Sequence, residues 1–197
     1  MVEKNSKDHS GGLMKISKLA ENEDKRTIEQ VTDNKFLNIK KVIDPEHGIG
    51  GYFFAERLGT DSIAFICVDK EFPEKVLLNN EYKPPNDEFI LGAFGGSLDK
   101  EKTPKAIAVE EVKQEAGYVV TEDDITDLGK VLVSTQMNQY CHLFVVKVDG
   151  DEEPEREPEN PCEALAETEW IDKSKVSELK DWKAITIVAK AEAKGLM

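Results

Sequence analysis

The sequence has few cysteines and no paired cysteine motif. Its 197 residues include three, Cys67, Cys141 and Cys162, an odd number without C-x-x-C spacing. This pattern argues against a zinc site or a disulfide framework. Cys67 and Cys141 lie in the apolar runs "AFICV" and "YCHLFVV", and we interpret both as small buried hydrophobic side chains.

Long apolar runs are absent as well. No segment approaches the ~18 consecutive apolar residues of a membrane-spanning helix. The first residues, "MVEKNSKDHSGG", contain no apolar core of a signal peptide. We therefore expect a cytoplasmic protein with no membrane partner.

Positive charge is scarce. The chain has 26 Lys and Arg against 40 Asp and Glu, so its formal net charge is -14. Nucleic-acid backbones are bound by clusters of Lys and Arg, and we expect no nucleic-acid partner. If the substrate is anionic, a cation must bridge it to this protein.

The length predicts one domain with additional terminal structure. Residues 1–34 are polar and charge-rich, and they are expected to form an N-terminal extension that is partly disordered or carries a weak helix. The remaining residues, 35–197, contain short strand-like runs bounded by turn signals. These runs are residues 36–44, 51–58, 62–69, 75–83, 88–94, 127–135, 140–148 and 168–172. With one central helix and a C-terminal helix or helix pair, the pattern predicts an α+β fold, an α/β/α sandwich with a mixed β-sheet and flanking helices.

The stretch "GGSLDKEKTPKAIAVEEVKQEAGY", residues 95–118, predicts a helix from Pro104 to Ala116. Thr103 suits the N-cap, and a proline suits the first helical position. Gly117 is a natural helix end. We expect the buried stripe of the helix to consist of Ala106, Val109, Val112 and Ala116.

Two carboxylates on this helix, Glu111 and Glu115, are four residues apart and project from one face. Such a like-charge pair costs a few tenths of a kcal/mol without a partner. Mg²⁺ or Mn²⁺ would turn the pair into a binding site, because hard cations prefer oxygen ligands. Taken alone, the pair could equally be a solvated acidic face.

The spacing of this stretch resembles the Nudix box, G-x5-E-x7-R-E-U-x-E-E-x-G-U, where U is apolar. The positions that match the pattern are Gly96, Glu111, Val112, Glu115, Gly117 and Tyr118. The flanks "EYKPP" and "ETEWI" resemble ADP-ribose pyrophosphatase-like members, and the likeness covers about residues 36–194. It implies a Nudix fold with a catalytic loop and helix at 95–117. It also implies metal-dependent hydrolysis of the diphosphate bond in a nucleotide-type substrate, with ADP-ribose or a related nucleotide sugar expected.

Three positions depart from the pattern. Lys102 replaces the first Glu and Glu110 replaces the Arg, which we interpret as one structural ion pair with exchanged signs. Gln114 replaces the middle Glu of the helix, and its amide oxygen can still bind a metal but brings no charge. The resemblance thus implies a Mg²⁺ or Mn²⁺ site of Glu111, Glu115, Gln114 and the Gly95 carbonyl. We expect reduced activity or a high metal requirement; a catalytically weak or inactive nucleotide-binding or regulatory domain is the alternative.

Further roles follow from the resemblance alone. Glu167 is the candidate general base, with Glu163 as the second choice. Lys83 in "EYKPP" could meet a substrate phosphate or be an exposed structural lysine. The strands of residues 35–58 resemble those that build a dimer in related enzymes, so a homodimer is expected.

Overall fold

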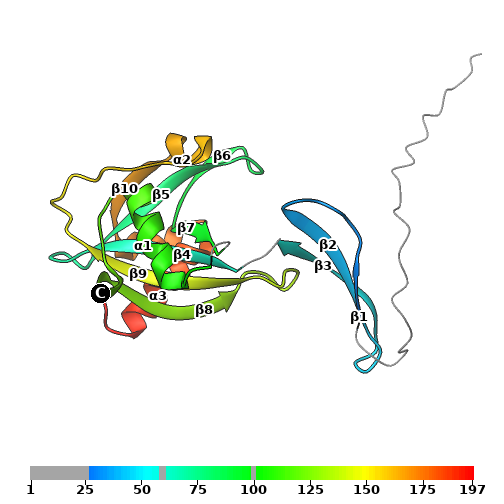
Figure 1. The fold of residues 1–197 in the computed structure, drawn as a ribbon. Coiled ribbons are helices and arrows are strands. Elements are labelled where there is room, and N and C mark those ends of the chain that lie inside the picture. The colour runs from blue at the N-terminus through cyan, green and yellow to red at the C-terminus, as the bar shows by residue number, and fades with distance from the viewer. Residues whose placement is uncertain (1–26, 58–60, 99–100) are drawn as a thin grey trace, which may run out of the picture. The chain divides into compact units, whose positions relative to one another are not determined.

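The computed structural model describes residues 27–57, 61–98 and 101–197 (Figure 1). The chain forms two compact units, one that ends at Ala55 and one that comprises Glu56–Met197. Most of the predicted extension over residues 1–34 lies outside the described residues, and its last part contains strand β1 (Thr27–Gln30).

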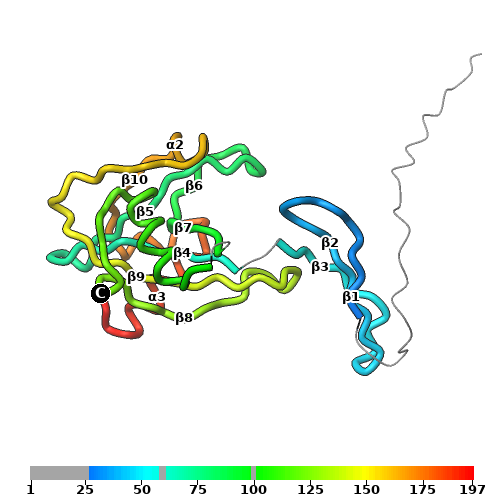
Figure 2. The backbone as a smooth tube through the Cα atoms, in the orientation of Figure 1, coloured from blue at the N-terminus to red at the C-terminus, as the bar shows by residue number. Residues whose placement is uncertain are grey.

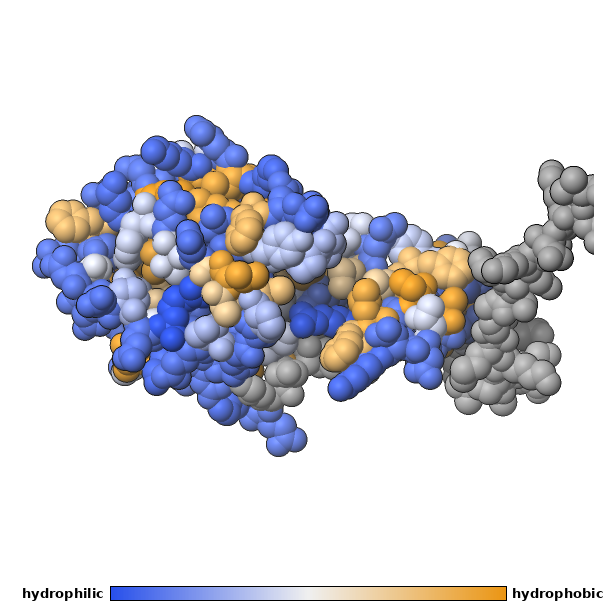
Figure 3. Space-filling model, turned by 90° about the horizontal axis from the view of Figure 1, so that it is seen from above, coloured by the Kyte–Doolittle hydropathy of each residue, from blue (hydrophilic) through white to orange (hydrophobic). Residues whose placement is uncertain are grey.

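The first unit is a three-stranded sheet in the order β1-β2-β3, in which β1 and β2 are antiparallel. Strands β2 (Leu37–Asp44) and β3 (Ile49–Arg57) coincide with two runs expected from the sequence. Gly48 in the turn between them has φ 70°, a left-handed conformation that favours glycine. Several large apolar side chains of this unit are exposed, and Figure 3 shows apolar patches on its surface.

The second unit is built on one seven-stranded mixed sheet. Its main order is β10-β5-β4-β9-β8, with β6 paired to β5 and β7 paired to β4. Strands β4 and β9 are parallel, whereas the other recorded neighbours are antiparallel. The bounds are β4 (Ser62–Asp69), β5 (Lys75–Lys83), β6 (Glu88–Gly92), β7 (Phe94–Ser97), β8 (Ile125–Leu132), β9 (Tyr140–Val148) and β10 (Glu167–Asp172).

Helices cover both faces of this sheet (Figure 1). They are α1 (Pro104–Glu111), which continues into a π-helical turn (Val112–Ala116), α2 (Pro161–Leu165) and α3 (Trp182–Ala193), with 3₁₀ turns at Glu122–Asp124 and Lys173–Glu178. The predicted α/β/α sandwich with a mixed sheet is therefore confirmed. Within the described ranges, no helix is both long and apolar enough to cross a lipid bilayer.

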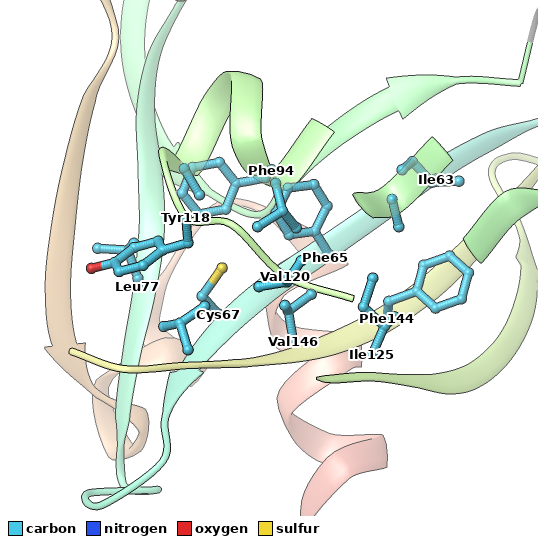
Figure 4. Packing of buried hydrophobic residues seen from close by; sticks show 14 of the residues in the cluster. Ile63, Phe65, Cys67, Leu77, Phe94, Tyr118, Val120, Ile125, Phe144 and Val146 are labelled. Carbon is cyan, nitrogen blue, oxygen red and sulfur yellow. The ribbon is translucent and has the colours of Figure 1, made fainter. Parts of the chain in front are cut away.

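The sheet separates two hydrophobic cores. Along β4, Ile63, Phe65 and Cys67 face α1, and the intervening Ala64, Ile66 and Val68 face α3, as strand alternation requires. Figure 4 shows the core on the α1 side, where the rings of Phe65 and Phe94 stack with centroids 5.1 Å apart. Cys67 lies in this core and Cys141 in the other, so both are buried as expected.

The helix of residues 104–116 has the predicted ends but a different buried stripe. Thr103 accepts a hydrogen bond from the Ala106 N–H, and Gly117 has φ 83° beyond the last turn. The fully buried members are Ile107, Ala108, Val112 and Ala116. Ala106 and Val109 are only partly buried, so their assignment to the buried stripe was wrong. The stripe advances in steps of four, which matches the wider π-helical turn at its end.

Strands β4 and β5 pair at only two positions, Cys67 with Leu77 and Val68 with Val76. Farther along, β4 pairs with β7 and β5 pairs with β6. The sheet thus opens between β4 and β5, and the glycine strand β7 lies at this opening beside α1.

Candidate functional site

The glycine strand and the end of the α1 helix are held together by one hydrogen bond. The N–H of Gly95 donates to Glu115 Oε2 at 3.0 Å. Because N–H and C=O of one strand residue point to the same edge, the Gly95 carbonyl is also directed away from β4. This orientation supports the predicted use of that carbonyl as a metal ligand, which stays a prediction.

Each glycine of this pair lies where a Cβ would be crowded, by a different neighbour. A Cβ at Gly96 would overlap the carboxylate and side-chain carbons of Glu111. A Cβ at Gly95 would lie 2.7 Å from the Ile63 carbonyl oxygen. The missing side chain of Gly96 therefore forms a cradle in which the Glu111 carboxylate lies against the strand backbone.

Glu115 is the buried carboxylate of the site. Its side chain is 4% exposed, and burial raises its pKa to about 8. The Gly95 N–H opposes this rise, whereas the carboxylates of Glu111, Glu163 and Glu81 increase it. A carboxylate that is buried among others is stabilised by a cation.

Strand β5 contributes the other wall. Leu77 faces α1, so alternation places Asn79, Glu81 and Lys83 on that same face. Lys83 Nζ lies 2.6 Å from Glu81 Oε2, and its predicted contact with a substrate phosphate stays a prediction. Asn79 is buried, and its Oδ1 accepts no hydrogen bond from the residues that the structure describes.

The connection from β9 to α2, residues 149–160, forms a strap over the end of the α1 helix (Figure 2). The N–H of Glu155 donates to the Gly117 carbonyl and that of Glu157 to the Gln114 carbonyl, both at 3.0 Å. Arg156 is half-buried and its Nε donates to the main-chain carbonyl of Glu115 at 2.6 Å. The strap thereby satisfies helix-end carbonyls that would otherwise lack partners.

The two departures with opposite charge are in contact. Lys102 Nζ forms a short ion pair with the Glu110 carboxylate, which joins the loop before α1 to the helix. Both side chains are partly exposed. Whether this pair holds the loop in its working position stays a prediction.

The third departure, Gln114, meets the strap. Its Nε2 donates to Glu159 Oε1 at 2.6 Å. The predicted role of its amide oxygen as a metal ligand stays a prediction.

The two candidate bases, Glu167 in β10 and Glu163 in α2, differ in their relation to Glu115. Glu167 pairs in register with Asn80, and two residues farther on Glu169 pairs with Leu78 of the α3-side core. Strand alternation therefore directs Glu167 toward the α3 face, away from Glu115. The structure does not bring the first-choice base to the carboxylate pair. Glu163, the second choice, acts electrostatically on Glu115.

Sequence reasoning missed the contributions of Glu81, Asn79 and Arg156. Alternation in "KVLLNNEYK" could have placed Glu81 on the face of Leu77. Arg156 is the lone basic residue of "DGDEEPEREPENPCEALAE". A single positive charge in so acidic a segment could have indicated that it binds nearby oxygen atoms. No signal in the sequence identifies which carbonyls it would bind, because they come from two separate helix ends, those of the α1 helix and of α2.

The donor set fits Mg²⁺ or Mn²⁺. Glu111, Glu115 and the Gly95 carbonyl would hold the ion with oxygen atoms, which hard divalent cations prefer. The buried carboxylate with its raised pKa and the glycine cradle for Glu111 are the features of this structure that support the fit.

A family model of the NUDIX domain matches residues 60–190. The chain belongs to the Nudix family. This confirms the family resemblance of the glycine loop and helix.

Individual relatives agree with this assignment. The chain is 30% identical over 122 residues to "Putative nudix hydrolase 2" of Caenorhabditis elegans, an alignment that covers 57% of this chain and 49% of that protein. It thus spans about half the length of that relative. A Nudix hydrolase of Schizosaccharomyces pombe is 26% identical over 149 residues, which cover 71% of this chain and 70% of the yeast protein.

A solved structure shares the fold. The crystal structure of an ADP compounds hydrolase matches with a TM-score of 0.63 and 16% identity, over 90% of this Nudix chain and all of the other. At this identity the match establishes the fold alone.

Replacing Glu115 by Gln should stabilise the metal-free protein at alkaline pH. The pKa of Glu115 rises from 4.5 to about 8 on folding, so between these values the folded state binds more protons than the unfolded state. The free energy of unfolding therefore falls as pH rises through this window. We expect Glu115→Gln to be more stable by about 4 kcal/mol at pH 8 and by less than about 0.5 kcal/mol near pH 4.5.

Urea denaturation in the presence of a chelator measures this difference. Glu178→Gln, a change at an exposed glutamate of the last 3₁₀ turn, is the matched control and should alter stability at neither pH. Equal stability of Glu115→Gln and wild type at pH 8 would contradict the assignment of a buried, destabilising charge.

Gly96→Ala should weaken metal binding while the fold is retained. The added Cβ displaces the flexible end of Glu111, so we expect Mn²⁺ affinity to fall by about 10- to 100-fold. The control is Gly50→Ala in β3, where a Cβ meets nothing within 4 Å. Calorimetric titration with Mn²⁺ measures the affinity of both variants. Unchanged affinity in Gly96→Ala would mean that metal binding does not need the space that Gly96 leaves for Glu111.

Proposed function

We propose that this Nudix protein is a metal-dependent pyrophosphohydrolase. It hydrolyses the diphosphate bond of a nucleoside diphosphate linked to another group, with ADP-ribose or a related nucleotide sugar as substrate. The observation that carries the proposal is the buried carboxylate Glu115 beside Glu111 against the glycine strand. The solved ADP compounds hydrolase of the same fold supports the choice of substrate class.

The bound cation would neutralise charge on the diphosphate and lower the pKa of a water molecule. Glu111, Glu115 and the Gly95 carbonyl would hold this ion. Gly95 also donates its N–H to Glu115 and thereby fixes the orientation of that carboxylate. Burial excludes water from Glu115, which strengthens its attraction to a cation.

The remaining roles are assigned by position. We propose Glu163 in place of Glu167 as the general base. The Glu163 carboxylate raises the pKa of Glu115, whereas the register of β10 directs Glu167 toward the α3 face. Lys83 lies on the site face of β5 and would exchange its partner Glu81 for a substrate phosphate. The cytoplasmic location expected from the sequence remains part of this proposal.

A substrate panel tests the reaction. Wild-type protein with Mg²⁺ or Mn²⁺ should convert ADP-ribose to AMP and ribose 5-phosphate, detected by chromatography, and NADH, diadenosine polyphosphates and other nucleotide sugars complete the panel. Glu115→Gln should lower turnover by about 100-fold or more, whereas Glu178→Gln should keep it. Tight nucleotide binding without turnover under any metal condition would support the alternative, a binding or regulatory domain.

We also propose that the first unit joins two copies of the chain. Its sheet exposes large apolar side chains, among them Ile28, Phe36, Tyr52 and Phe53. Exposed apolar groups gathered on so small a unit are typical of an interaction surface. A second copy offers the same surface, so a symmetric dimer would cover both.

Light scattering coupled to size exclusion should give twice the chain mass of 22.1 kDa at micromolar concentration. The double variant Phe36→Lys with Phe53→Lys should run as a monomer, because two charges would be buried in the interface. The matched control is Phe72→Lys, a change at an exposed phenylalanine of the second unit. A monomeric wild type, or a dimeric double variant, would exclude this interface.

A further inference from the structure

The contact between Gln114 and Glu159 has a consequence for the charge of the site. A carboxylate at position 114, as in the family pattern, could not donate a hydrogen bond at neutral pH. The amide of Gln114 can, and its Nε2 lies 2.6 Å from Glu159 Oε1. The residue that removes a carboxylate from the helix thus binds a carboxylate from the strap.

The backbone of the strap is fixed on both sides of Glu159. Before it, main-chain N–H groups of Glu155 and Glu157 bond the end of the α1 helix. After it, the Glu159 N–H itself donates to Glu163 Oε2 at 2.7 Å. The position of Glu159 is therefore set by hydrogen bonds on both sides and does not depend on its contact with Gln114 alone.

Arg156 locks this arrangement to the rest of the domain. Its guanidinium donates to three main-chain carbonyls, those of Glu115 at 2.6 Å, Ala166 at 2.5 Å and Glu163 at 2.8 Å. The first belongs to the α1 helix end, and the other two belong to α2 and to the residue that precedes β10. One side chain thus joins the metal-binding helix to the segment that carries Glu159 and Glu163.

Helix α2, which follows the strap, also acts electrostatically on the site. Glu163, which holds the Glu159 N–H, is among the carboxylates that influence buried Glu115. Glu163 thus acts on Glu115 and also binds Glu159, and Glu159 in turn accepts a hydrogen bond from Gln114 in the same helical turn as Glu115.

We propose that Glu159, held by Gln114 and the strap, returns to the cation site the carboxylate charge that helix position 114 lacks. Glu159 is a positioning and charge-supplying residue for the site described above, and this inference deepens the proposed function on whose metal site it rests. The amide of Gln114 orients the Glu159 carboxylate by donating to it. The charge count near Glu111 and Glu115 then matches that of a site with three glutamates.

The neighbouring strap residue offers a matched control. Glu157 lies two positions before Glu159, is also exposed, and forms an ordinary ion pair with Lys113 at 2.8 Å. Replacing it by Gln removes the same charge from the same strap. Glu157→Gln therefore separates the specific contribution of Glu159 from the general effect of the acidic loop.

Mn²⁺ titration of the full chain by calorimetry tests the proposal. Glu159→Gln should weaken Mn²⁺ affinity by about 10- to 100-fold, and Glu157→Gln should change it by less than about twofold. The exchange variant, Gln114→Glu with Glu159→Gln, rebuilds the same pair with donor and acceptor swapped. It should restore affinity to within about threefold of wild type. A merely structural role of Glu159 predicts no loss of affinity in Glu159→Gln, because the new amide oxygen can still accept the hydrogen bond from Gln114.

Three results would overturn the proposal: equal affinities of Glu159→Gln and Glu157→Gln, failure of the exchange variant to recover affinity, or no Mn²⁺ binding by wild type. Turnover measured on the same samples separates the two claims. If the affinities follow the expected order but no substrate is cleaved, the proposed function fails and the role of Glu159 stands. If wild type is active and Glu159→Gln binds Mn²⁺ as tightly, the role of Glu159 fails and the function stands.

Discussion

The hydrogen bond from the Gly95 N–H to Glu115 is the interaction on which the site depends. It joins the glycine strand to the end of the α1 helix, and the carboxylate that accepts it is buried. The opening between β4 and β5 admits the glycine strand, and the absent Cβ of Gly96 admits Glu111. The fold thus brings two carboxylates and a glycine backbone together before any ligand is bound, at the expense of a buried charge that only a proton or a cation relieves.

Strand alternation and helix-end signals, which depend on neighbouring residues, predict most of the elements that form the site. Alternation located the strands closely, and Thr103, Pro104 and Gly117 located both ends of the helix, because caps and turns depend on adjacent residues. The pairing of the carboxylates Glu111 and Glu115 on one side of the helix is likewise readable, since residues four apart share a helical face. The family pattern then connected that pair with the glycine loop that precedes it.

Features that depend on long-range packing were not readable. Two of the four predicted members of the buried stripe, Ala106 and Val109, are only partly buried, because the packing of α1 on the sheet decides which helix face is covered. The family resemblance implies Glu167 as the base, but the register of β10 against β5 decides which face of the sheet this side chain occupies. The contacts of the strap are not readable from its sequence, because Arg156 binds carbonyls of two elements that are far apart in the chain, the α1 helix end and α2.

The three departures from the family pattern are of two physical kinds. Lys102 and Glu110 exchange signs across a contact and leave its net charge unchanged. Gln114 removes a charge, and a change of that kind can be balanced only by a carboxylate from elsewhere. The strap of residues 149–160 is strongly acidic, and backbone bonds hold it against the helix end where the charge is missing. Its negative charge would repel an anionic nucleotide in the absence of metal. The same charge attracts a divalent cation, so an acidic surface and a phosphate-containing substrate are compatible once the cation lies between them.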